Sequence, residues 1–123
     1  TLSSFAFQGT GASVHPQLQQ LLQQMHAQRK PIGAWCIAPA ILALCFRGKG
    51  LQLTVGCDPG TGALLEQLGA VAVRKAVHEV CVDEAQRIVT TPAYMYEARI
   101  NEVARGIDAA VVELLRLAAL PRT

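Results

Sequence analysis

Apolar residues recur every three to four positions near the start of the chain. Within residues 17–28 they share one helical face and glutamines occupy the others, which predicts an amphipathic helix. Ser13 or one of its neighbours can cap this helix, Pro16 suits its first turn, and Pro31 ends it. The apolar positions are Leu18, Leu21, Leu22 and Met25.

Short aliphatic segments separated by turn residues predict strands between helices in the middle of the chain. The expected elements, in order, are a strand at 31–35, a helix that starts at Ala38 and stops in the basic, glycine-containing run 47–50, a strand at 51–55, a turn at 58–62, a helix at 63–68 and a short strand at 71–73.

The last third of the chain combines two strands with one long helix. Residues 79–83 and 87–91 are expected to form strands around a polar turn, in the manner of a hairpin. An amphipathic helix follows from about Met95 to Leu117, in which Gly106 either weakens the helix modestly or permits close packing. Its expected core stripe is Ile100, Val103, Ile107, Val111, Leu114 and Leu115.

Helices that alternate with short aliphatic strands indicate a parallel sheet covered by helices on both faces. Ligands of such sheets bind beyond the carboxyl ends of the strands. Cys36 and the loop Thr90-Thr91-Pro92 both lie at predicted strand ends, so they can line one pocket.

Composition limits the function classes. The chain has 123 residues, 51% of them hydrophobic, which suffices for one domain with a core. A net charge of +2, scattered along the sequence, gives no support for nucleic-acid binding. No apolar run reaches the roughly 18 residues of a membrane span, and the start lacks the layout of a secretory signal.

Cys36 is the candidate for chemistry, because its neighbourhood resembles a nucleophile elbow. Ala34 and Ala38 provide the small residues that a sharp strand-to-helix turn needs two positions before and after the nucleophile. A helix start also favours a thiolate. The alternative from spacing alone is a small buried hydrophobe, which is also the interpretation of Cys45, Cys57 and Cys81.

The four cysteines show neither a CxxC pair nor metal-ligand spacing, so no metal site is expected. A disulfide scaffold is improbable in so aliphatic a chain, and the thiols indicate a reducing compartment, the mitochondrial matrix or the cytoplasm.

Several segments together resemble one family, the ElbB-like proteins and their vertebrate mitochondrial homologues, within the ThiJ/PfpI (class I glutamine amidotransferase-like) superfamily. The elbow segment matches in Lys30-Pro31-Ile32-Gly33 and Cys36-Ile37-Ala38-Pro39. The other matching stretches are Thr1-Leu2-Ser3-Ser4-Phe5-Ala6, Leu53-Thr54-Val55-Gly56, residues 87–95 and Gly106-Ile107-Asp108. They cover nearly the whole chain in the family's order.

The resemblance implies a flavodoxin-like three-layer α/β/α sandwich with a mostly parallel sheet. Residues 1–123 would form the C-terminal portion of a single domain. The N-terminal part of the fold, with an acidic residue and a glycine-rich GGFG loop, would precede Thr1. The expected partners are that N-terminal part, further copies in a homodimer or larger assembly, and a small aldehyde.

The resemblance also implies a chemistry. Related proteins convert small 2-oxoaldehydes to hydroxy acids without a cofactor, as glyoxalase III-like lyases. Here Cys36 would be the nucleophile, and the Ile37 backbone N–H would stabilise the oxyanion. Thr90, Thr91, Pro92 and Tyr94 are expected pocket-lining residues. A Cys–His–Glu triad, as in glutamine hydrolysis, is not visible, because His15, His26 and His78 suit solvated surface positions.

Two alternatives stay open from the sequence. The chain can be a binding or assembly module whose catalytic site has decayed, or Cys36 can be a redox sensor that oxidises before the other thiols.

Overall fold

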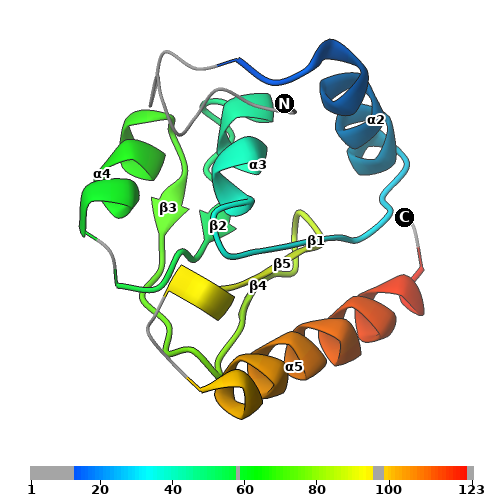
Figure 1. Ribbon diagram of the computed structural model, residues 1–123. Coiled ribbons are helices and arrows are strands. Elements are labelled where there is room, and N and C mark those ends of the chain that lie inside the picture. Colours follow the sequence, from blue (N-terminus) through cyan, green and yellow to red (C-terminus); the bar gives the residue numbers. More distant parts are fainter. Residues whose placement is uncertain (1–12, 58, 96–98, 122–123) are drawn as a thin grey trace.

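The computed structural model describes residues 13–57, 59–95 and 99–121, without the side chain of Tyr94. The chain forms an α/β/α sandwich of the flavodoxin-like type with mostly parallel strands (Figure 1). The resemblance of Thr1–Ala6 to the family falls outside the described residues.

The main sheet has three strands in the order β1-β5-β4: β1 is Ile32–Trp35, β5 is Ile88–Thr91 and β4 is Cys81–Asp83. The strands β1 and β5 are parallel, with Ile32 opposite Ile88. The strands β4 and β5 pair antiparallel, which confirms the predicted hairpin. All four β5 residues are buried, so this strand is the centre of the sheet.

A second, two-stranded parallel sheet consists of β2 (Gln52–Leu53) and β3 (Val71–Ala72). Side chains of the main sheet accept hydrogen bonds from the backbone of this second sheet and of the residue that follows β2. The Gln52 N–H donates to Asp83 Oδ2 (2.9 Å), and the Thr54 N–H donates to the Thr90 hydroxyl (3.0 Å). The strand β2 is shorter than the predicted 51–55, and the N–H of Thr54, just beyond its end, bonds a side chain rather than a strand.

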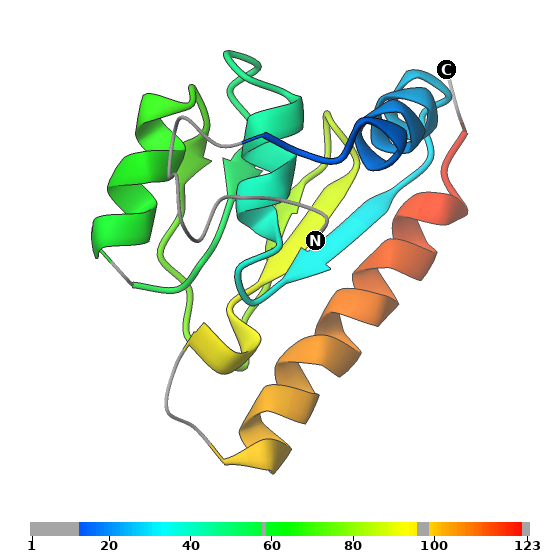
Figure 2. The same cartoon turned by 45° about the horizontal axis from the view of Figure 1, so that its top comes forward.

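Helices cover both faces of the main sheet. Figures 1 and 2 show α2 (Pro16–Ala27) and α3 (Pro39–Cys45) on one face and α5 (Ile100–Ala118) on the other. The helix α4 (Pro59–Gln67) packs beside β3. The larger apolar core lies between α3 and the two sheets. A smaller apolar cluster lies between β5 and α5.

Two predicted boundaries are wrong. The expected turn at 58–62 is largely helical, because α4 begins at Pro59, a residue suited to a first helical turn. The last helix begins at Ile100 rather than near Met95, and Ala93–Met95 form a separate 3₁₀ turn, η2. The cap of α2 is His15, whose Nδ1 accepts the Gln17 N–H at 3.2 Å.

The packing face of α5 also differs from the predicted stripe. Of the predicted residues, Ile100, Val111 and Leu115 are 77%, 41% and 67% exposed. The predicted Val103 is buried, and the predicted Ile107 and Leu114 pack partly buried against the apolar clusters. The other buried residues, Gly106, Ala110 and Leu117, were not predicted. The physical reason is a backbone contact at Gly106, where a Cβ atom would lie only 2.3 Å from the Val77 carbonyl oxygen. This close approach sets the rotation of the helix.

Candidate functional site

Cys36 lies at a sharp turn between β1 and α3. Its φ of +64° belongs to the left-handed region, which residues other than glycine adopt rarely and mainly where the surrounding structure enforces it. The Cys36 N–H donates to the Thr91 carbonyl oxygen at 3.2 Å, so the turn is joined to the end of β5. The side chain is half-buried beside Val77, Ala93 and Val103.

The backbone after Cys36 is compact. The Ala38 N–H donates to the Trp35 carbonyl oxygen (3.2 Å), and the Ala40 N–H donates to that of Ile37 (3.0 Å). The Ile37 N–H makes no hydrogen bond to the described residues, and the Ile37 side chain is 43% exposed. Its role as an oxyanion donor stays a prediction.

The predicted pocket residues of β5 lie beside the turn but are enclosed. Thr90 and Thr91 are fully buried, and Pro92 is buried as well. The Thr90 hydroxyl accepts the Thr54 N–H, and the Thr91 hydroxyl donates to the Glu79 carbonyl oxygen at 2.8 Å. Both hydroxyls therefore hold elements together. The pocket-lining role stays a prediction, and the side chain of Tyr94 lies outside the described residues.

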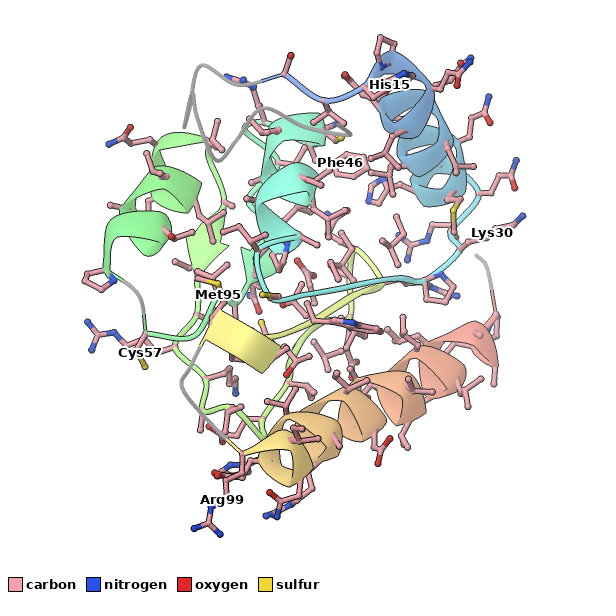
Figure 3. The ribbon with its side chains drawn as sticks, in the orientation of Figure 1. His15, Lys30, Phe46, Cys57, Met95 and Arg99 are labelled. Atoms are coloured by element: carbon pink, nitrogen blue, oxygen red, sulfur yellow. The ribbon has the colours of Figure 1, made fainter. Side chains whose placement is uncertain are left out.

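Two of the three histidines have structural contacts away from Cys36. His26 Nε2 lies 2.7 Å from Gln86 Oε1, and the centroid of its ring lies 4.8 Å from that of Phe46, with the two rings tilted by 44°. Gln86 precedes β5, whereas Cys36 follows the other end of β1, so His26 lies at the opposite end of the sheet. Figure 3 shows His15 at the end of α2, where it caps the helix. His78 is exposed.

The remaining thiols differ in environment. Burial raises the pKa of Cys45 and is also the main cause of the raised pKa of Cys81. Cys57 is exposed and follows β2 (Figure 3). No disulfide joins the four cysteines, all of which lie in the described ranges.

Cys57 borders a cavity of about 270 Å³ that sequence reasoning did not single out. It lies between the ends of β2 and β3 and the first turns of α4, and Glu66 and Arg74 also line it. The only signal in the sequence is the glycine-containing segment between β2 and α4.

Within the described residues, no group of His, Cys, Asp and Glu side chains is arranged to hold a metal ion. None of the helices in the same ranges combines the length and the apolar character needed to cross a membrane.

Three known proteins similar to this chain are mitochondrial proteins by name. The chain is 36% identical over 125 residues to the rat "ES1 protein homolog, mitochondrial", covering 94% of this chain and 46% of that protein. The human "glutamine amidotransferase-like class 1 domain-containing protein 3, mitochondrial" matches with the same identity and coverage. The zebrafish "ES1 protein, mitochondrial" is 26% identical over 132 residues, with 48% of that protein covered. No family model matches the chain.

A solved structure supports the fold. An isoprenoid biosynthesis protein with an amidotransferase-like domain from Ehrlichia chaffeensis superposes with a TM-score of 0.78 at 24% identity, over 85% of this chain and 49% of that one. The chain thus spans about half the length of the relatives it matches. The resemblance stated from the sequence is confirmed: over 94% of its length the chain is similar to an ES1 protein homologue and to a glutamine amidotransferase-like class 1 domain-containing protein, and it shares the fold of an amidotransferase-like domain.

Proposed function

We propose that the protein containing this chain converts small 2-oxoaldehydes to 2-hydroxy acids, with Cys36 as the nucleophile and no organic cofactor. The observation that carries the proposal is the Cys36 turn. A half-buried thiol at φ +64° follows directly after β1, and the next backbone N–H, that of Ile37, has no partner among the described residues.

The reaction needs no external oxidant. The Cys36 thiolate bonds to the aldehyde carbon of methylglyoxal, and the aldehyde oxygen, close to the Ile37 N–H, gains a proton to give a hemithioacetal. The hydrogen on that carbon then leaves as a proton, and C2 receives a proton. The first carbon is thereby oxidised to a thioester while the second is reduced to an alcohol. Water cleaves the C–S bond, releasing lactate and the thiol.

The proton transfer between the two carbons requires a base. Glu79 is the acidic residue whose backbone contacts the turn region, through its carbonyl oxygen and the Thr91 hydroxyl. Its carboxylate, however, accepts the Ala76 N–H at 2.8 Å on the surface. The proposal therefore assigns the base to an acidic group outside the described residues, which the resemblance places in the part of the domain before Thr1.

Lactate formation from methylglyoxal by the complete protein tests this function. Cys36→Ala should lower kcat/KM at least 100-fold with an unchanged circular dichroism spectrum. Cys57→Ala removes another accessible thiol, at the end of β2, and should keep activity within twofold. Equal activity in Cys36→Ala refutes the role of Cys36. An inactive wild-type protein would instead support the decayed binding module.

A redox role for Cys36 is the second candidate, favoured by the contrast among the thiols. Burial keeps Cys45 and Cys81 protonated, whereas Cys36 is half-buried. In peroxide titrations followed by mass spectrometry, Cys36 should form sulfenic acid first. Earlier oxidation of the exposed Cys57 would contradict it.

The names of the three relatives also suggest where the protein acts. All three are called mitochondrial, and the proposal places this chain in the mitochondrial matrix. Imaging of a fluorescent fusion of the complete protein tests this, and a cytosolic signal would contradict it.

A further inference from the structure

The cavity of about 270 Å³ beside Cys57 lies where a parallel sheet normally binds its ligands. Val55 and Cys57 line it from the segment that follows β2, and Val73 and Arg74 line it from the segment that follows β3. It therefore lies beyond the carboxyl ends of both parallel strands. Figure 3 shows Cys57 just before α4, the helix that joins the two strands.

The cavity has one cation, Arg74, and this side chain is exposed. It makes no hydrogen bond or ion pair with the described residues, so its guanidinium has unused donors beside the cavity. The acidic lining residue is Glu66, whose carboxylate accepts the Ala72 N–H at 3.1 Å. That bond holds the carboxylate beside β3.

The backbone donors of the cavity lining are largely occupied. The Gly56 N–H donates to the Thr54 hydroxyl at 3.0 Å, and the Val73 N–H donates to the Leu53 carbonyl oxygen at 2.8 Å. The remaining wall is apolar and consists of Val55, Pro59, Ala63, Ala72 and Val73. The cavity thus combines one guanidinium with a hydrocarbon surface.

This combination selects a class of ligand. The planar guanidinium offers two parallel N–H donors, which match the two oxygens of one carboxylate. A short hydrocarbon chain suits the apolar wall and the small volume. Inorganic phosphate would need more donors than the lining supplies, and a second carboxylate would meet the negative charge of Glu66.

We propose that this cavity is a binding site for a short-chain monocarboxylate. Arg74 binds the carboxylate, and Val55, Ala63 and Val73 contact the hydrocarbon chain. Neither Cys36 nor Thr91 lines the cavity, so the inference does not depend on the proposed chemistry.

Saturation-transfer NMR of butyrate with the complete protein tests the site. Arg74→Gln should weaken butyrate binding roughly tenfold or more, because the charge-assisted pair is lost. Its fold should be intact by circular dichroism, since Arg74 is exposed and has no partner among the described residues. The matched control is Arg105→Gln, an exposed arginine on α5, which should bind butyrate within twofold of the wild type.

Cys57 locates the bound molecule, because its exposed thiol borders the cavity. Butyrate should slow the labelling of Cys57 by iodoacetamide, followed by mass spectrometry, in the wild type and in Arg105→Gln but not in Arg74→Gln. Butyramide, succinate and inorganic phosphate should each give weaker protection than butyrate.

Four outcomes would overturn the inference. Absence of butyrate binding at millimolar concentration removes the site, and equal binding by the wild type and Arg74→Gln removes the role of Arg74. Binding that leaves the labelling of Cys57 unchanged places butyrate elsewhere. Equal protection by butyramide would make the cavity merely apolar, and equal protection by phosphate or succinate would make it a general anion site.

Discussion

Gly106→Ala is the sharpest test of the packing between α5 and the sheet. A Cβ atom at this position would lie 2.3 Å from the Val77 carbonyl oxygen and 3.0 Å from the Thr91 hydroxyl oxygen. The first contact is with backbone, which cannot move aside as a side chain can. The helix must therefore shift by roughly 1 Å to restore an ordinary carbon–oxygen contact of about 3.3 Å.

The expected magnitude follows from two opposing effects. Overpacking of this kind costs about 1–3 kcal/mol, whereas replacing a helical glycine by alanine gains up to about 1 kcal/mol. Since a backbone atom is involved, we expect the upper part of the first range and a net loss of about 2 kcal/mol. For a domain of this size that lowers Tm by roughly 6–10 °C.

Thermal and urea unfolding of the protein measure this change, and Gly62→Ala is the matched control. Gly62 also lies in a helix, α4, but an added Cβ would meet only the Ala72 Cβ at 3.7 Å, an ordinary contact. The control should be stabilised by about 0.5–1 kcal/mol. If Gly106→Ala were as stable as Gly62→Ala, the close approach to Val77 would not set the position of α5.

Two further predictions concern a buried cation and the buried thiols. Arg87 is only 5% exposed, and its guanidinium donates to the carbonyl oxygens of Leu117 and Leu120 (both 3.3 Å) and of Pro121. Arg87→Met should therefore lower the free energy of unfolding by about 2–3 kcal/mol. It should also speed amide exchange in the last turn of α5. Normal exchange there would refute the anchoring role. The raised pKa values of Cys45 and Cys81 mean that the folded state holds these protons more tightly. Their contribution to stability is therefore full below the unfolded thiol pKa and is lost as pH rises through the folded pKa. Between about pH 8 and 10, unfolding free energy should fall less in Cys45→Ala than in the wild type, and an equal fall would contradict this.

Local periodicity predicted several elements well. The strand at Ile32–Trp35, the hairpin of β4 and β5 and the helix at Pro16–Ala27 all follow from short-range patterns. The error at Ile100, Val111 and Leu115 of α5 has a different origin. Hydrophobicity favoured Ile100 and Leu115, but the closest packing uses the smallest residue, Gly106, whose contact with Val77 bridges distant positions in the sequence. No local pattern contains that contact.

The candidate site shows the same limit. The small residues around Cys36 predicted a sharp turn, because the demand for space there is local. The contacts of Thr90 and Thr91 were not predictable, since each hydroxyl bonds a segment at least 12 residues away, near Thr54 or Glu79. Arg87 was missed for a related reason. A charged residue at the start of a predicted strand is normally expected at the surface, and the carbonyl oxygen of Leu117 that Arg87 bonds lies 30 residues later in the chain.

The open edge of β1 and the incomplete surroundings of Cys36 have one structural cause. The described residues next to Cys36 include Thr91, Val77 and Val103. On the side of β1 away from β5, no strand lies among the described residues. A strand added parallel to β1 would end beside Cys36, because the carboxyl ends of parallel strands meet at one edge of the sheet. A strand in that position would bring a base at its end within reach of Cys36, as the proposed chemistry requires. Lactate formation by this chain alone would show that the base lies within these 123 residues.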